Sequence, residues 1–207
     1  MGFLPAAAGS EDYANHFAVY LDEYFERSVS TIPVYRGRDG RRGKNAERMA
    51  GSAHLYVGGG VADHLLDALA DTPCADALAA KLVSGGTVAA IAAGAQSVGV
   101  AVRSIFGGDL IDGLGLLRGG VVETNFEGRA GGSSDRRLRQ MLAHPMAEWG
   151  LAIGSGAAVL LGPGGELRVV GEAYYIDGPN GELERLEPNI TPELHLPKES
   201  PPEAPAN

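Results

Sequence analysis

The chain has 207 residues, of which 44% are hydrophobic and 21% charged, and its formal net charge is −9. This length and composition are typical of one globular domain with a sheet covered by helices on both faces. The acidic charge argues against nonspecific nucleic-acid binding, and no stretch reaches the roughly 18 uncharged apolar residues that span a bilayer. The single cysteine excludes an internal disulfide framework, and no secretory signal is visible, so we expect a cytoplasmic protein that binds neither nucleic acid nor membrane.

Strand and helix patterns alternate through the first half of the chain. Ser10 is placed to cap an amphipathic helix, and Thr72-Pro73 is a typical helix start with proline at the first helical position. A triple glycine at 58–60 follows a short strand and frees backbone amides there. The predicted elements are strands at 2–8, 31–35 and 53–57, a Gly/Arg-rich loop at 36–45, and helices at 11–26, 63–70 and 73–83.

Residues 87–91 are the centre of the predicted fold. They are small or β-branched, which is typical of a strand buried on both faces, and helical spacing follows at once over 93–103. The glycine-rich strand ends at 58–60 and 92–94 are therefore expected to share one crevice at the carboxyl edge of a sheet. The later predicted elements are a loop at 107–120, a helix at 136–143, and strands at 121–125, 149–153, 157–161, 167–170 and 173–177.

The order of these elements predicts an α/β fold. We expect a doubly wound, mostly parallel sheet with helices on both faces, followed by short C-terminal β-strands. This domain is expected to span residues 1–177. The remainder, 178–207, is acidic and proline-rich and has no periodicity, so we expect it to be disordered.

The turn at 90–94, Ala-Ile-Ala-Ala-Gly, has the small residues that a nucleophile elbow needs between a strand and a helix. Around it, several segments resemble, in the same order, those of the cyanophycinase and dipeptidase E family of serine peptidases. That resemblance implies a class I glutamine amidotransferase-like fold over roughly residues 2–177. The matching segments lie at 56–63, 90–95, 113–117, 123–129, 136–138 and 152–159.

Three positions depart from the family pattern in a way that decides the predicted chemistry. The resemblance places the nucleophilic serine at Ala92, the histidine base at Asn125 and the acid at Ser155. Alanine has no nucleophile, asparagine does not cycle a proton near neutral pH, and serine carries no charge to stabilise an imidazolium. The resemblance thus implies a degenerate relative with no intact catalytic residue, a pseudoenzyme rather than a peptidase.

The residues that remain predict a binding site. The amides of Gly59, Gly60 and Ala93 are placed to donate hydrogen bonds to a carbonyl or a carboxylate. Arg129 is a candidate contact for a ligand carboxylate, with an ordinary surface arginine as the equal alternative. We expect a peptide or amino-acid ligand. We expect no cofactor, and no metal either, because the histidines lack metal-ligand spacing.

The partner and the function leave alternatives open. The resemblance implies a homodimer, or a heteromer with an active homologue. A serine-type hydrolase of dipeptides or β-aspartyl-arginine peptides, using residues outside the aligned positions, is the second hypothesis. A regulatory protein that works through the basic segment 36–48 and the acidic C-terminal end is the third. Ser97 and Cys74 are expected to be packing residues, and His64 a polar surface residue near the pocket rim.

Overall fold

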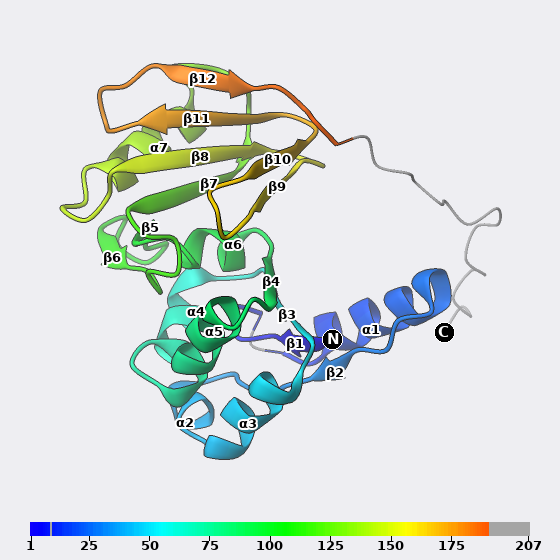
Figure 1. Cartoon of the computed structure of the whole chain (residues 1–207). Coiled ribbons are helices and arrows are strands. Elements are labelled where there is room, and N and C mark those ends of the chain that lie inside the picture. Colours follow the sequence, from blue (N-terminus) through cyan, green and yellow to red (C-terminus); the bar gives the residue numbers. More distant parts are fainter. Residues whose placement is uncertain (9, 191–207) are drawn as a thin grey trace, which may run out of the picture.

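Two four-stranded sheets form the framework of the protein. We call the sheet of strands β1 to β4 sheet A and the sheet of β7, β8, β11 and β12 sheet C, and Figure 1 shows sheet C above sheet A. The computed structural model describes residues 1–8 and 10–190. Sheet A is wholly parallel, with the order β2-β1-β3-β4, and sheet C is mixed, with the order β12-β11-β8-β7. The strands of sheet A are β1 (Gly2–Leu4), β2 (Ser30–Thr31), β3 (His54–Val57) and β4 (Thr87–Ala90); those of sheet C are β7 (Gly120–Phe126), β8 (Trp149–Gly154), β11 (Ala173–Asp177) and β12 (Leu183–Leu186).

Helices connect the parallel strands, which confirms the predicted α/β fold class. Two antiparallel hairpins, β5–β6 and β9–β10, complete the described chain. The helices are α1 (Asp12–Phe25), α2 (Gly37–Gly40), α3 (Gly43–Gly51), α4 (Ala62–Leu69), α5 (Pro73–Val83), α6 (Ala93–Ser97) and α7 (Ser133–Leu142). The hairpin strands are β5 (Ala101–Arg103), β6 (Leu110–Asp112), β9 (Ala158–Leu161) and β10 (Leu167–Val170).

Each sheet has its own buried apolar cluster, formed with the helices that pack against it. The cluster of sheet A packs the strands against α4 and α5, and the cluster of sheet C packs its strands against α7. Large members of the first are Leu4, Leu55, Val57, Leu65, Leu69 and Leu78; large members of the second are Phe126, Leu138, Met141, Leu142 and Ile176.

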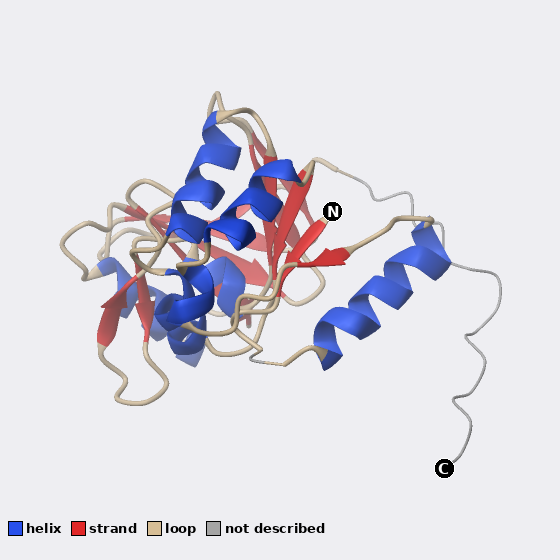
Figure 2. Ribbon diagram, turned by 90° about the horizontal axis from the view of Figure 1, so that it is seen from below, coloured by secondary structure: helices blue, strands red, loops and turns tan. Residues whose placement is uncertain are grey.

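Helix α1 lies at the margin of the molecule in both ribbon views (Figures 1 and 2). Its first half is anchored by aromatic contacts, with the rings of Phe17 and Phe3 5.2 Å apart. Its only fully buried residue is Ala14, and Val19, Tyr20 and Phe25 are exposed. The amphipathic pattern thus predicted the helix correctly, although only part of its apolar side is covered.

Strand β4 is an edge strand, so the prediction that it is buried on both faces is wrong. Its side chains are half-buried or exposed, and its one strand partner is β3. Small and β-branched residues suit an edge as well as a sheet centre, and the sequence pattern alone does not separate the two. The reason lies in the larger architecture, since the sheet stops here and sheet C begins separately.

The Gly/Arg-rich stretch at 36–45 is helical rather than a loop. It forms α2 and the start of α3, held together by the buried Asn45. The Asn45 Nδ2 group donates to the carbonyl oxygens of Asp39 (3.0 Å) and Pro33 (3.2 Å). One buried amide side chain therefore satisfies the carbonyl groups that would otherwise favour an open loop.

The helix predicted over 93–103 ends early. α6 stops at Ser97, and residues 101–103 turn into β5. Gly99 makes this turn possible, because a Cβ atom there would lie 2.8 Å from the carbonyl oxygen of Gly120. The predicted loop at 107–120 likewise contains β6.

The first part of the predicted disordered tail, residues 178–190, is structured. β12 pairs antiparallel with β11 inside this region, and Asn189 Oδ1 accepts a hydrogen bond from the backbone of Val169 (2.7 Å). The sheet therefore continues past the predicted boundary at 177, through an edge strand in which two charged residues separate Leu183 from Leu186. Residues 191–207, also assigned to the tail, lie outside the described residues.

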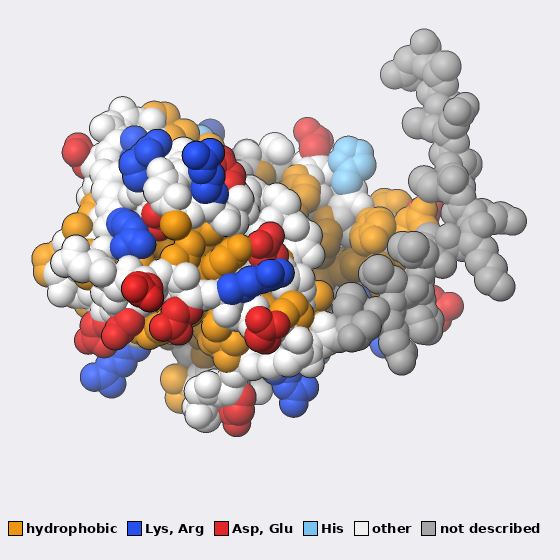
Figure 3. Space-filling view, turned by 90° about the horizontal axis from the view of Figure 1, so that it is seen from above, with side chains coloured by type: hydrophobic (Ala, Val, Ile, Leu, Met, Phe, Trp, Pro, Cys, Tyr) orange, Lys and Arg blue, Asp and Glu red, His pale blue; other side chains and the backbone are white. Residues whose placement is uncertain are grey.

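Basic and acidic side chains are intermixed on the surface of the protein shown in Figure 3. On the face shown in Figure 3, basic and acidic side chains of the described residues are interspersed with apolar ones rather than gathered in one area. Within residues 1–8 and 10–190, no helix has the length and apolar character to cross a membrane.

Candidate functional site

The elbow predicted from the sequence is formed at the carboxyl end of β4. The chain passes from Ala90 through Ile91 and Ala92 directly into α6. Ala92 has φ 49° and ψ −122°, a conformation that costs a non-glycine residue about 1–3 kcal/mol. Its side chain is half-exposed. The turn thus projects a side chain out of the sheet, as a nucleophile elbow does, but that side chain is a methyl group.

Close backbone packing brings the glycine segment after β3 beside the elbow. A Cβ atom at Gly59 would lie 3.1 Å from the Cβ of Ala92, and one at Gly94 would lie 2.7 Å from the carbonyl oxygen of Val57. Side chains at either position would push the two strand ends apart. The sequence prediction that the two glycine-rich strand ends share one crevice is consistent with this contact.

The three predicted donor amides are free within the part of the chain that the structure describes. The N–H groups of Gly59, Gly60 and Ala93 donate to no described residue, whereas the neighbouring Gly58 N–H bonds to the Leu4 carbonyl oxygen (3.0 Å). Backbone amides that have no partner among the described residues are suited to bind a carbonyl or a carboxylate oxygen.

Asn125 and Ser155 meet although they are 30 residues apart. The Ser155 Oγ donates to the Asn125 Oδ1 (3.3 Å), and both side chains are exposed. Asn125 has φ 53° and sits at an irregularity between β7 and β8. This bulge re-aims the asparagine out of the sheet and toward the residue that follows β8.

A buried ion pair next to this site was not assigned a role from the sequence. Glu123, 1% exposed, accepts from Arg137 Nη2 (2.6 Å) and Nε (2.8 Å), and Gln96 Nε2 donates to its other oxygen (3.3 Å). Burial raises the pKa of Glu123, and the Arg137 and Gln96 contacts oppose that rise. The network joins the elbow helix α6 to strand β7. A glutamate within the apolar run of residues 120–123 is the sequence feature that could have indicated this network.

The other candidates are placed as follows. Arg129 is exposed in the turn after β7, and its guanidinium contacts no described hydrogen-bond or ion-pair partner. Ser97 is buried and its Oγ donates to the Ala93 carbonyl oxygen (2.7 Å), so it packs as expected. Cys74 is buried in the first turn of α5, where burial raises the pKa of its thiol to about 11. His64 is exposed on α4.

The three positions that the family resemblance assigned to catalysis carry one methyl group and two neutral polar groups. Neither the Ala92 methyl nor the Asn125–Ser155 pair supplies an activated nucleophile or a base that titrates near neutral pH. Within the described residues, no group of three or more His, Cys, Asp or Glu side chains is arranged to hold a metal ion.

Comparisons with known proteins relate the fold to peptidases. The sequence matches no family model and no curated protein. A crystal structure of a peptidase from an acI-B1 Actinobacterium has a TM-score of 0.74 at 22% identity, over 92% of this chain and 81% of that one. A Putative Peptidase E Protein from Listeria monocytogenes EGD-e has a TM-score of 0.51 at 14% identity, over 90% of this chain and 85% of that one. The chain therefore shares the α/β fold of these peptidase structures.

Proposed function

We propose that the protein is a catalytically silent relative of the peptidases whose fold it shares, and that it binds a peptide or an amino acid at the elbow. The observation that carries this proposal is Ala92, which has the strained backbone of an elbow without a hydroxyl group. Strain of about 1–3 kcal/mol persists only where the surrounding structure holds it, so a use for the turn other than nucleophilic attack is supported.

The free amides indicate what part of the ligand binds there. Gly59, Gly60 and Ala93 present N–H groups without described acceptors, and Ala92 offers only a small apolar surface between them. A ligand carbonyl or carboxylate oxygen fits this set of donors. The exposed Asn125–Ser155 pair adds neutral polar groups nearby, which suit an uncleaved peptide bond.

A steady-state hydrolysis assay tests the absence of chemistry. The unmodified chain is incubated with a dipeptide panel that includes β-aspartyl-arginine, beside the Ala92→Ser/Asn125→His variant. Binding groups alone accelerate hydrolysis by about 10³-fold to 10⁴-fold over the reaction in water. We expect the unmodified chain not to exceed that rate. Robust turnover by the unmodified chain would show a hydrolase that uses other residues, and the proposal would fail.

We also propose that a second copy of the chain pairs along β4, in a cytoplasmic homodimer. The Ile91 N–H donates to the Val57 carbonyl oxygen (3.2 Å), so the backbone groups of Val88 and Ala90 point away from β3. Those groups bond to no described residue. Three other strands lie at the outer edges of the two four-stranded sheets: β2 has two residues and is soon followed by Pro33, β12 carries charged residues, and β7 is largely buried.

A two-fold axis makes such a pair antiparallel, and we propose the register that is centred on Ala89. Two copies of β4 related by a two-fold axis run antiparallel, and Val88 of each copy then exchanges hydrogen bonds with Ala90 of the other. Ala89 faces its own counterpart at a Cα separation of about 4.5 Å, which its small side chain allows. The elbow follows β4 directly, so the second copy would lie beside the candidate site.

Cysteine cross-linking tests this register, because the natural Cys74 is buried. Under mild oxidation the Ala89→Cys chain is expected to form a covalent dimer, since about 4.5 Å lies within the disulfide range. Thr87→Cys is the matched control: Thr87 is expected to face Ile91 of the other copy, too far from its own counterpart to cross-link. Equal cross-linking of both variants, or a monomer by light scattering, would overturn the dimer.

A further inference from the structure

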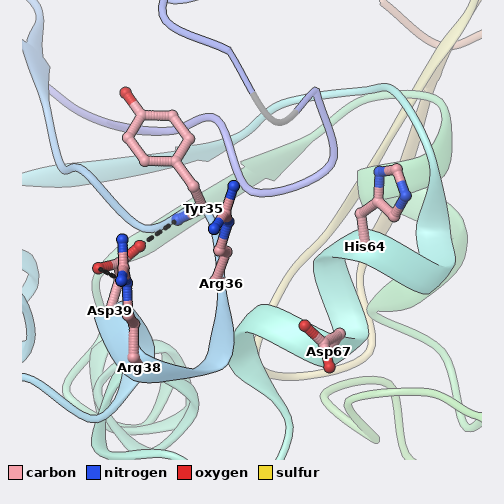
Figure 4. Close-up of a pocket in the computed structure, with 6 residues that line it drawn as sticks. All are labelled: Tyr35, Arg36, Arg38, Asp39, His64 and Asp67. Atoms are coloured by element: carbon pink, nitrogen blue, oxygen red, sulfur yellow. Dashed lines mark hydrogen bonds and ion pairs between the residues drawn. The ribbon is translucent and has the colours of Figure 1, made fainter.

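A pocket of about 560 Å³ lies between α2 and α4 (Figure 4). Its size is within the range of small-molecule sites. Neither the elbow residue Ala92 nor the Asn125–Ser155 pair lines it, so it is a different place on the protein. The lining residues are Tyr35, Arg36, Arg38, Asp39, His64 and Asp67.

The walls of this pocket are held by tight packing. α2 lies so close to α4 that a Cβ atom at Gly40 would be 2.1 Å from the carbonyl oxygen of Ala68. Asp39, 5% exposed, is fully engaged: its carboxylate accepts from the Tyr35 N–H (3.3 Å) and pairs with Arg42 (3.2 Å). Asp39 therefore fixes the wall, and its charge is not available to a ligand.

Arg38, which also lines the pocket, pairs with Asp39 (3.8 Å), and two opposite charges then remain beside the open space. Arg36 and Asp67 are exposed, and neither forms an ion pair with the other or with any other residue that the structure describes. Figure 4 shows Arg36, His64 and Asp67 around one open region, while the Tyr35 hydroxyl points away from it. The pocket thus presents a guanidinium on the α2 side and a carboxylate on the α4 side. A simple anion would be attracted by Arg36 but repelled by Asp67.

An apolar rim adjoins His64. Ile105 and Phe106 are 64% and 71% exposed, and the Phe106 ring centre lies 6.0 Å from that of His64. Asp63 holds this turn in place by accepting from Ser104 Oγ and from the Ile105 N–H (3.2 Å). Two exposed apolar side chains are therefore kept beside the charged pocket by specific hydrogen bonds.

We propose that this pocket binds a small zwitterion with an apolar side chain, either a free amino acid or a dipeptide with both ends free. The ligand carboxylate pairs with Arg36, whose planar guanidinium matches two carboxylate oxygens. The ligand ammonium pairs with Asp67, and the apolar side chain packs against Phe106 and His64. This site goes beyond the function proposed for the elbow, and the Arg36 and Asp67 variants distinguish the two, because neither residue belongs to the elbow.

Calorimetric titration with leucine and leucyl-leucine tests the proposal and distinguishes the two ligand sizes. Each is compared with its N-acetylated form, which lacks the ammonium, and its C-terminal amide, which lacks the carboxylate. We expect saturable binding by at least one zwitterion and about 10-fold to 100-fold weaker binding by each blocked form, since each loses one charge-assisted contact.

Two variants assign the contacts. Arg36→Gln should bind the acid and the amide equally, and Asp67→Asn should bind the free and the acetylated amine equally. Arg41→Gln and Asp76→Asn, which change exposed charges outside the pocket, are the matched controls and should keep the full discrimination. Thermal melting of each variant confirms that it is folded.

A third variant tests the rim. Phe106→Ala should weaken leucyl-leucine several-fold while leaving glycyl-glycine unchanged, because only the larger ligand reaches the ring. The proposal is overturned if neither zwitterion binds saturably, or if blocked and free forms bind alike. It is also overturned if inorganic phosphate binds as tightly as leucyl-leucine and Asp67→Asn strengthens the binding of phosphate. The last result would identify a simple anion site.

Discussion

Ala92 is the central residue of the candidate site. Its position after β4, its positive φ and its contact with Gly59 all follow from the need to turn sharply between a strand and a helix. The sequence predicted this turn from small residues alone. It did not predict the strain, because backbone angles depend on how the two strand ends pack.

Glycine at position 92 should stabilise the protein. Glycine adopts φ 49° without a Cβ penalty, so Ala92→Gly is expected to raise the free energy of unfolding by about 1 kcal/mol, measured by urea denaturation. Ala89→Gly, in the ordinary extended part of β4, is the control and should lower it by about 0.5–1 kcal/mol. Equal losses for both variants would show that Ala92 is not strained.

Other residues show where sequence reasoning reached its limit. The proximity of Asn125 and Ser155 was implied by the family resemblance, and the hydrogen bond between them is consistent with it. The engagement of Glu123 was not foreseen, because its partners Arg137 and Gln96 come from α7 and α6. Contacts between distant elements leave no periodic trace in a sequence, so a charge in a buried strand is the only indication of them.

At the scale of elements, the Glu123–Arg137 pair fastens α7 to β7 and, through Gln96, to the elbow helix. Arg137→Ala would leave the buried Glu123 with Gln96 as its remaining side-chain partner. We expect a loss of about 2–3 kcal/mol in the free energy of unfolding near neutral pH. Glu123→Gln is the control. It removes the charge and should cost less, because no buried ion is left without its partner.

The loss of unfolding free energy in Arg137→Ala should increase with pH. Burial raises the pKa of Glu123, and removing Arg137 raises it further, so the folded variant holds the proton more tightly than the unfolded chain does. In the variant, the stabilising contribution of protonated Glu123 is fully present below the ordinary pKa of a glutamate. It is lost as the pH rises through the raised pKa of the folded state. The difference between Arg137→Ala and the unmodified chain should therefore grow from pH 5 to pH 8 in urea melts. A difference that shrinks over this range would refute the assignment.

The elements differ in how well the sequence predicted them. α5 was found from Thr72-Pro73, and the Thr72 side chain does accept a hydrogen bond from the Ala75 N–H (3.4 Å). The stretch at 36–45 was misassigned because Asn45, rather than local propensity, organises its carbonyl groups. The exposure of β4 was misjudged because a strand's neighbours are set by the whole sheet, not by its own residues.

At the scale of the whole molecule, the alternation of strands and helices predicted the α/β class, but not the division into two sheets with separate cores. The domain boundary was placed too early because β12 is short and half charged, and such an edge strand resembles a solvated segment. The overall fold places the elbow, the glycine segment and the Asn125–Ser155 pair near strand ends, where ligands of α/β sheets bind.

Intact mass spectrometry after treatment with a serine-reactive fluorophosphonate tests the central claim most directly. The claim is that the elbow lacks only its reactive groups, at Ala92, Asn125 and Ser155. The account predicts no adduct on the unmodified chain and one adduct per chain on the Ala92→Ser/Asn125→His/Ser155→Glu variant, located at position 92 by peptide mapping. A stoichiometric adduct on the unmodified chain, or none on a folded triple variant, would contradict it.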